Sequence, residues 1–284
     1  MMEPYLLLAM LGYLFYAIST SIDKHMMNKK YAIIRTSVLK TFFEGSMLLL
    51  IGVIFFNVQF TAELFIGALL LALCFIISIL LYYRMLTGSE ISEVSPFLQS
   101  SEMLLAFFCS ILLFHEAVST INYLGIFVIL FGSILVLSKN NFKIPKIGSK
   151  NYMIFVLIAV DVMYMLIAKE FVNGVDPIGL AIAMYLSVAL LLSIYQAISK
   201  KELENKAKPE ISRVMASSVS GGFGTLLLFT ALSIGNASKV YPISGLMSVF
   251  VVIISVIFLK EKFSMHRLIG AILVFAGIYL TSIG

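Results

Sequence analysis

The chain has 284 residues, of which 61% are apolar and 12% are charged. Soluble domains contain roughly 45–50% apolar and about 25% charged residues, so this composition excludes a secreted disulfide scaffold, a disordered regulator and an ordinary cytosolic enzyme. The net charge of +5 would favour nucleic-acid binding in a soluble protein. A membrane protein needs basic loops to set its topology instead, and we expect no nucleic-acid partner.

Long apolar runs follow one another along the chain. A bilayer core ~30 Å thick is crossed by about 20 apolar residues in a helix. Ten runs come close to this length or exceed it, at residues 5–22, 36–56, 64–86, 94–114, 120–137, 152–170, 177–198, 212–234, 239–259 and 265–283. The sequence therefore predicts an all-α membrane protein with ten transmembrane helices, placed in the cell membrane as a multi-pass integral protein.

The two halves of the chain resemble each other. Residues 110–135 match residues 255–280 at an offset of 145, with six identities in 26 positions. The identical pairs are Ser110/Ser255, Glu116/Glu261, Ser119/Ser264, Gly125/Gly270, Gly132/Gly277 and Leu135/Leu280. We interpret residues 1–138 and 152–284 as two five-helix repeats, joined by a basic connecting loop at residues 139–151.

An odd number of helices in each repeat predicts that the second repeat is inverted relative to the first. Under this topology the connections on one side of the membrane hold 17 Lys and Arg, and those on the other side hold 2. By the positive-inside rule the basic side is cytoplasmic, which predicts that both termini lie outside. A site between inverted repeats, near the midplane, can open to either side of the membrane.

Three acids lie deep within predicted helices. Glu44 and Glu102 each lie about eight residues into their runs, and Asp161 about nine. At 1.5 Å per residue these side chains are ~12–14 Å deep, where a charge costs at least ~2.5 kcal/mol. Each should therefore face a partner or a water-filled cavity. For each acid, the alternative is a protonated or hydrogen-bonded group that only stabilises helix packing.

Glu102 is the strongest candidate because polar residues surround it. Gln99 lies three residues earlier, on the same helix face. Lys40 precedes Glu44 by four residues, so the two could neutralise each other. Alternatively, Lys40 could extend to the membrane interface.

Further polar residues complete the predicted substrate site. Tyr164 follows Asp161 by three residues and shares its face, and Tyr241 lies near the start of the ninth run. Ser244 belongs to the small, polar stretch of the second repeat that corresponds to the surroundings of Glu102. The alternative for both tyrosines is an anchor at the membrane interface.

Motifs for other chemistry are absent from the sequence. We find no metal-binding helix motif, no phosphate-cradling glycine loop and no nucleophile elbow. The sequence therefore predicts no metal, no cofactor and no enzymatic activity. Concentrative transport would then depend on an ion or solute gradient.

One segment of the second repeat carries a resemblance to a known family. It reads Ala231-Leu232-x-x-Gly235-x-Ala237-Ser238-Lys239-Val240-x-Pro242, and Leu259-Lys260-Glu261-Lys262, Gly270 and Gly277 follow it. The first repeat carries a looser copy with Gly88-x-x-x-Ser92-x-Val94-x-Pro96, Glu116, Gly125 and Gly132. These motifs resemble the EamA domain of the drug/metabolite transporter superfamily.

The resemblance implies a ten-helix carrier with inverted repeats, often an exporter of amino acids or other small metabolites. It implies a structural role for Glu116 and Glu261 at a helix end, and cytoplasmic termini, opposite to the orientation that the loop charges predict.

The predicted function is a secondary active transporter that exports small polar metabolites such as amino acids by alternating access. The predicted substrate-binding residues are Glu44, Gln99, Glu102, Asp161, Tyr164, Tyr241 and Ser244. Coupling to protons and assembly into a homodimer are left open. The alternatives are an organic-phosphate or nucleotide-sugar exchanger, which the three acids disfavour, and a non-transporting membrane partner or sensor.

Overall fold

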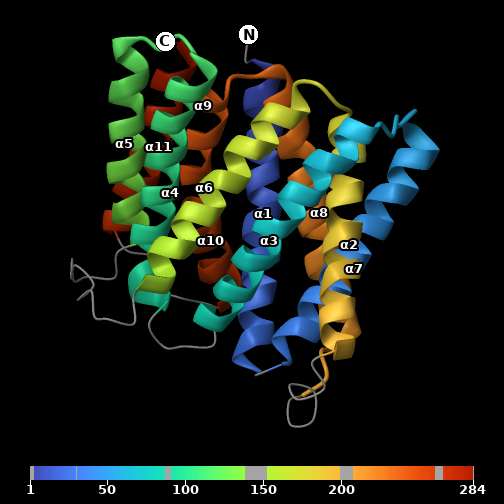
Figure 1. The fold of residues 1–284 in the computed structure, drawn as a ribbon. Helices are drawn as coiled ribbons and strands as arrows, with labels where there is room; N and C mark the ends of the chain where they lie inside the picture. The colour runs from blue at the N-terminus through green and yellow to red at the C-terminus, as the bar shows by residue number, and fades with distance from the viewer. Residues whose placement is uncertain are drawn as a thin grey trace.

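The computed structural model describes residues 3–29, 31–86, 91–137, 152–198, 207–259 and 265–283, and these residues form a bundle of helices (Figure 1). The helices are α1 (Pro4–Asn28), α2 (Ile33–Phe55), α3 (Ala62–Leu86), α4 (Ile91–Phe114), α5 (Thr120–Leu137), α6 (Tyr152–Val172), α7 (Pro177–Ile198), α8 (Ile211–Ile234), α9 (Ala237–Val240), the 3₁₀ helix η3 (Tyr241–Ser244), α10 (Gly245–Leu259) and α11 (Met265–Ile283).

Among the described residues, seven helices are long and apolar enough to cross a membrane: α1, α2, α3, α6, α7, α8 and α11. Residues 101–114 of α4 and 120–136 of α5 form shorter apolar helices. Large apolar side chains also cover the outside of the bundle, and Val53, Phe55 and Leu112 are each more than 70% exposed. Such a surface suits lipid, so the prediction of a multi-pass integral membrane protein is confirmed. That α4, α5 and α10 also cross the membrane remains a prediction.

The ninth predicted run is not one uniform helix. It is divided into α9, η3 and α10. Pro242 lies at the start of the 3₁₀ turn and has no backbone N–H to donate. The backbone nevertheless stays close to helical at Tyr241, with φ of −63° and ψ of −37°. The chain therefore continues in the same direction, while the backbone hydrogen bonds change locally from the α-helical to the 3₁₀ pattern.

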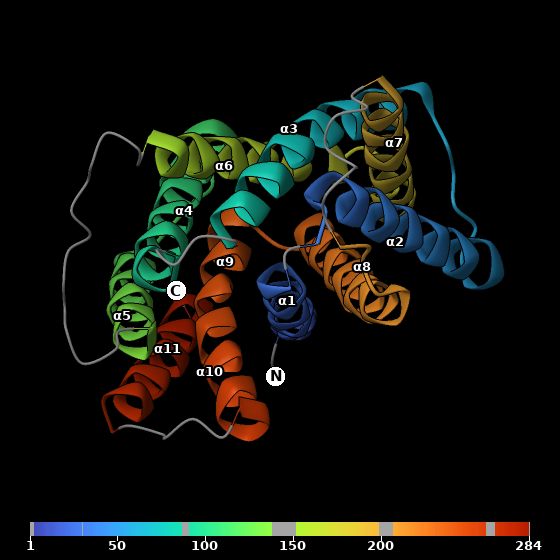
Figure 2. The same cartoon turned by 90° about the horizontal axis from the view of Figure 1, so that it is seen from below.

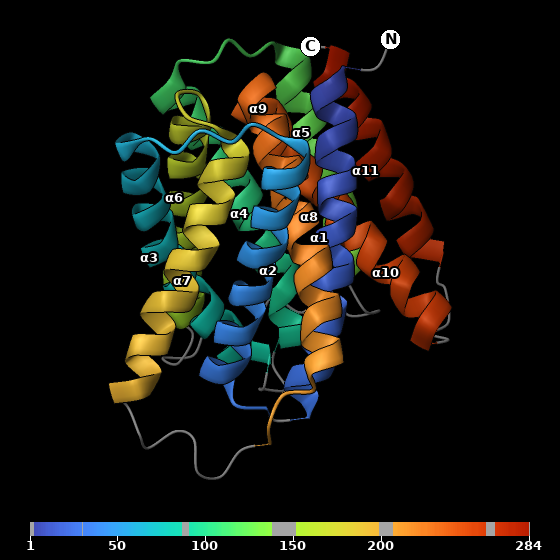
Figure 3. The same ribbon diagram turned by 90° about the vertical axis from the view of Figure 1, so that its right-hand side faces the viewer.

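The helices pack in pairs that join the two halves of the chain. α5 lies along α11, α1 along α8, α2 along α7 and α3 along α6. Seen from below, the α5–α11 pair and the α2–α7 pair stand at opposite edges of the bundle, with α1 between them (Figure 2). The beginning of α1 and the end of α11 lie at the same end of the bundle (Figure 3).

Glycines set the closest of these contacts, between α5 and α11. A Cβ added to Gly132 would lie 2.7 Å from the carbonyl oxygen of Gly270, and one added to Gly270 would lie 2.7 Å from the carbonyl oxygen of Gly132. Gly125 and Gly277 stand in the same reciprocal relation. These four glycines are those that the sequence repeat aligned, and their lack of side chains lets the two backbones touch.

Candidate functional site

A cluster of ionic and hydroxyl side chains is buried where α1, α2 and α8 meet. We call it the Lys40 cluster: Ser19 and Asp23 from α1, Lys40 and Glu44 from α2, and Ser217 from α8. Residues four apart on a helix share a face. Ser19 and Asp23 therefore point together towards α2, and Lys40 and Glu44 point together towards α1.

Lys40 binds Asp23 at the centre of this cluster. Its Nζ lies 2.5 Å from Asp23 Oδ2 and donates a second hydrogen bond to Ser19 Oγ at 3.1 Å. Ser217 Oγ donates to the other carboxylate oxygen of Asp23, Oδ1, at 2.6 Å. Lys40 is only 7% exposed, so the alternative in which it extends to the membrane interface is wrong.

The carboxyl group of Glu44 has fewer polar partners than that of Asp23. Its Oε1 lies 3.9 Å from Lys40 Nζ, which is an ion-pair distance but too long for a hydrogen bond. Its Oε2 finds no hydrogen-bond partner within the described residues, although the residue is only 1% exposed. The expected pairing of Lys40 with Glu44 is thus present, but Lys40 binds Asp23 more closely.

Gly221 of α8 makes room for the Glu44 carboxyl. A Cβ added to Gly221 would overlap Glu44 Oε1 and lie 3.3 Å from Ser19 Oγ. Gly224, one turn further along α8, faces the ring of Tyr16 and the backbone of Gly12. Gly221 therefore leaves room for the cluster, whereas Gly224 allows close packing of α8 on α1.

A second acidic site lies between α4 and α6. The carboxyl groups of Glu102 on α4 and Asp161 on α6 are in hydrogen-bonding contact. Asp161 is also in hydrogen-bonding contact with the hydroxyl of Ser78 on α3. Glu102 Oε1 is buried and finds no hydrogen-bond partner in the described part of the chain. We call these two residues the acid pair. No ion pair joins either carboxyl to a Lys or Arg among the residues that the structure describes.

Tyrosines fill the space between the two acidic sites. The hydroxyls of Tyr16 on α1 and Tyr185 on α7 both bond to Thr225 Oγ1 on α8, at 2.7 Å and 2.5 Å. The ring of Tyr164 packs against Phe229 of α8. Tyr164 is near enough to interact electrostatically with Glu44 of one site and Asp161 of the other.

The remaining predicted site residues have different surroundings. Tyr241 is buried and donates its hydroxyl to the carbonyl oxygen of Met165, so it ties η3 to α6. Ser244 is half-buried at the end of η3, next to Tyr13 of α1, which also neighbours Glu102. Gln99 lies in α4, but its side chain is outside the described part of the structure.

Sequence reasoning missed Ser19, Asp23 and Ser217. Asp23 lies just beyond the first predicted apolar run, which ends at residue 22, whereas α1 continues to Asn28. The i, i+4 spacing of Ser19 and Asp23, repeated by Lys40 and Glu44, was the available signal. Ser217 carries no comparable signal, because only the packing of α8 on α1 brings it to Asp23.

Two other polar residues hold the bundle together near α9. Glu116 accepts hydrogen bonds from the backbone N–H groups of Ala237 at 2.8 Å and Ser238 at 2.7 Å. Lys169 donates to the carbonyl oxygens of Leu232 at 2.8 Å and Gly235 at 2.9 Å. These contacts agree with the structural role expected for Glu116. Its counterpart Glu261 lies outside the described residues.

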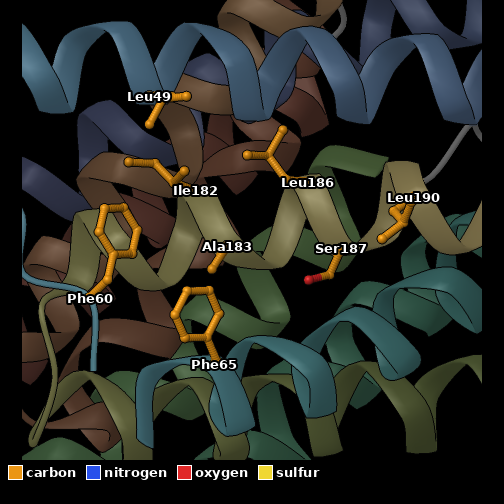
Figure 4. A pocket seen from close by; sticks show the side chains of 8 residues that line it. All are labelled: Leu49, Phe60, Phe65, Ile182, Ala183, Leu186, Ser187 and Leu190. Carbon is orange, nitrogen blue, oxygen red and sulfur yellow. The ribbon is translucent and has the colours of Figure 1, made fainter. Parts of the chain in front are cut away.

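An apolar groove of about 370 Å³ lies between α2, α3 and α7 (Figure 4). Its lining residues are Leu49, Phe60, Phe65, Ile182, Ala183, Leu186, Ser187 and Leu190. Several of these side chains are exposed on the lipid-facing surface, including Phe60, Phe65 and Leu190. The groove offers no charged group, so it does not suit the polar solute that the sequence predicts.

Within the described residues, no three His, Cys, Asp or Glu side chains gather closely enough to hold a metal ion. The buried polar groups of the described residues include carboxyls, hydroxyls and the ammonium groups of Lys40 and Lys169. They can bind a proton, an ammonium group or a hydrogen-bonding solute.

A multi-pass helical bundle with acids buried between its helices is the class of structure that membrane transport proteins have. Comparison with known families agrees, since the EamA-like transporter family matches residues 3–138 and again residues 150–283. The chain belongs to the EamA-like transporter family, a family of membrane transporters. The resemblance that the sequence motifs carry is confirmed.

Two similar proteins extend this comparison. An uncharacterized protein of Methanocaldococcus jannaschii is 32% identical over 96 residues, which are 34% of this chain and 70% of that protein. A protein of known crystal structure superposes with a TM-score of 0.79 over 99% of both chains, at 14% identity. At that identity the second likeness concerns the fold alone.

Proposed function

We propose that the protein is a secondary active transporter that exports small polar metabolites bearing an amino group, such as amino acids, across the cell membrane. It works by alternating access at a site between two inverted five-helix repeats. The observation that carries this proposal is the acid pair, in which one half of the chain supplies Glu102 and the other supplies Asp161.

The pattern of helix contacts supports the inverted repeat. Equivalent helices in the two halves are α1 and α6, α2 and α7, α3 and α8, and α5 and α11. Exchanging equivalents converts the α3–α6 contact into the α8–α1 contact and leaves the α2–α7 and α5–α11 contacts unchanged. The reciprocal glycine contacts follow the same rule. A two-fold relation between the halves accounts for this pattern and provides two parts that can rock against each other.

The acid pair supports a substrate with a positive group. Two carboxyls in contact cannot both be ionised without a compensating charge. An ammonium group of the substrate can supply that charge. The hydroxyl of Tyr13, which is near Glu102, and the hydroxyl of Ser244, which is near Tyr13, provide hydrogen-bonding groups for the rest of a small polar solute.

The same acids disfavour the exchanger of organic phosphates or nucleotide sugars. A phosphate needs cationic partners. Lys40 is already bound to Asp23, and Lys169 donates to backbone carbonyls. A non-transporting membrane partner requires none of these buried acids, and it predicts no solute flux.

Thermal unfolding of the detergent-purified protein against a panel of amino acids, amines and phosphorylated compounds tests the proposal first. A ligand at 100 times its Kd stabilises the folded state by about 2.7 kcal/mol. We expect stabilisation by amino acids and none by the phosphorylated compounds. Stabilisation by phosphorylated compounds alone would overturn the proposal in favour of the exchanger.

Transport in proteoliposomes tests the role of the acid pair. We expect Glu102→Gln to abolish the flux of the stabilising amino acid while the purified variant keeps the unfolding temperature of the unmodified protein within a few degrees. Glu170→Gln, at an exposed position on α6, is the matched control and should transport normally. Full flux in Glu102→Gln would remove Glu102 from the mechanism.

A further inference from the structure

The Lys40 cluster is a second ionic site, and its charges do not balance. It contains one ammonium group, on Lys40, and two carboxyl groups, on Asp23 and Glu44. Both oxygens of Asp23 are bonded, one to Lys40 and one to Ser217. Lys40 and Asp23 therefore compensate each other, and Glu44 is the group left over.

A second carboxylate here would leave an uncompensated negative charge in a buried, largely apolar setting. Glu44 is 1% exposed, and its Oε2 has no hydrogen-bond partner among the described residues. An isolated buried charge of this kind is strongly disfavoured, and such a group becomes neutral instead. One proton on Glu44 brings the net charge of the cluster to zero.

A proton suits this site better than a metal cation does. The place between Asp23 and Glu44 that a cation would take is already filled by Lys40 Nζ, 2.5 Å from Asp23 Oδ2 and 3.9 Å from Glu44 Oε1. Na⁺ would have to displace this ammonium group or lie beside it. The described residues also contain no group of three His, Cys, Asp or Glu side chains that could hold a metal ion.

We propose that Glu44 is the proton-binding residue that couples transport to a proton gradient, at a site separate from the substrate-binding acid pair. This inference rests on the proposed transporter function. In the coupling step the O–H bond of the Glu44 carboxyl breaks, the proton passes to water on one side of the membrane, and the electron pair stays on the carboxylate. Lys40 remains an ammonium group throughout.

The cluster is placed so that this proton affects the contact between the two halves of the chain. α1 and α2 belong to the first half and α8 to the second, and Ser217 of α8 donates to Asp23 of α1. Once Glu44 loses its proton, its carboxylate competes with Asp23 for Lys40. Weakening the Lys40–Asp23 bond changes the charge that Ser217 meets at Asp23, and so changes the contact between α8 and α1.

Titratable and charged groups face Glu44 from each neighbouring helix. They are Lys40 on α2, Asp23 and Tyr16 on α1, Tyr83 on α3, Tyr164 on α6 and Tyr185 on α7. α8 contributes hydroxyls and glycines at this point, including Ser217 and Gly221. Tyrosine hydroxyls stay neutral near physiological pH, so the cluster holds one exchangeable proton, on Glu44.

Infrared spectroscopy of detergent-purified protein, labelled with ¹³C-glutamate and titrated with acid and base, tests the proton site without any substrate. We expect a labelled, protonated carboxyl band that is lost in Glu44→Gln and kept in Glu102→Gln. Asp23→Asn keeps Glu44 but frees Lys40 to pair with it, so this variant should also lose the band at neutral pH. A band unchanged by Glu44→Gln, or unchanged by Asp23→Asn, would overturn the assignment.

Flux of ¹⁴C-labelled amino acids in proteoliposomes separates this inference from the proposed function. We expect an imposed pH gradient to drive flux in the unmodified protein and not in Glu44→Gln. An equal response to the gradient in both proteins would overturn the coupling role alone. Absence of flux under every condition in the unmodified protein, with the infrared band present, would overturn the proposed function and the coupling role together.

Discussion

The two buried acidic sites differ in their countercharge. In the Lys40 cluster a lysine lies between two carboxyls and binds one of them at 2.5 Å. In the acid pair, Glu102 and Asp161 meet each other without an ion pair to Lys or Arg among the described residues. The Lys40 cluster has its own cation and needs one proton to become neutral, whereas the acid pair, with no Lys or Arg bound to it in the described part of the chain, can accept a cationic ligand. On this difference rests our proposal that the first site couples transport to protons and the second binds the substrate.

Removal of Lys40 should have the largest effect on stability, because it takes away the countercharge that distinguishes the Lys40 cluster from the acid pair. Lys40→Met leaves Asp23 buried with Ser217 as its remaining partner. Breaking a buried pair by removing one partner costs about 3–5 kcal/mol, and we expect a loss of that size in the free energy of unfolding. The companion variant Lys40→Met with Asp23→Asn, which removes both charges, should recover much of it. Chemical unfolding in detergent measures both, and a Lys40→Met protein of unmodified stability would contradict the central place of this ion pair.

Filling the space that Gly221 leaves for Glu44 should have the next largest effect on stability. Gly221→Ala places a methyl group where Glu44 Oε1 lies, and overpacking of this kind costs about 1–3 kcal/mol. The same substitution combined with Glu44→Ala should cost much less, because the clashing carboxyl is gone. Gly174→Ala is the matched control, since its added Cβ meets only Glu63 Oε1 at 3.5 Å. Equal losses for Gly221→Ala with and without Glu44 would contradict the predicted clash.

The contact of Glu116 with α9 lies outside both acidic sites and should affect stability rather than coupling. Glu116→Ala leaves the N–H groups of Ala237 and Ser238 without their acceptor, and loss of a comparable helix cap costs about 0.5–2 kcal/mol. Glu170→Ala, at an exposed position, should leave the free energy of unfolding unchanged. A pH dependence of transport altered by Glu116→Ala would show that Glu116 has more than a structural role.

The smallest effect is expected in the apolar groove. Ser187 lines the groove but belongs to neither acidic site. Ser187→Ala should change the free energy of unfolding by no more than about 0.5 kcal/mol and leave amino-acid flux unchanged. A large loss of flux would place the solute pathway along α7 instead of between α4 and α6.

The membrane class and most helix positions could be predicted because hydropathy and helix length are local properties of the chain. Family membership could be predicted from the motif around Gly235 and Pro242. The exact end of α1 could not, because the segment after residue 22 is polar. In the folded chain this segment binds Lys40 through Asp23 and buries Met26 and Met27, and these contacts exist only after the helices pack.

The acids were predicted as single deep residues, but their partners depend on packing. Depth along a helix identified Glu44, Glu102 and Asp161 from the sequence. It did not indicate that Lys40 would prefer Asp23 to Glu44, which lies on its own helix. Which acids share a site depends on how α1 and α2 pack on α8 and how α4 packs on α6, and the contacts with α8 and α6 are not local in sequence.

Flux in proteoliposomes that hold the unmodified protein, Glu44→Gln or Glu102→Gln tests the division between the two sites most directly. Exchange of ¹⁴C-labelled amino acids across the membrane without a gradient is compared with accumulation driven by an imposed pH gradient. The account predicts that Glu44→Gln keeps exchange and loses gradient-driven accumulation, whereas Glu102→Gln loses both. Identical behaviour of the two variants would contradict it.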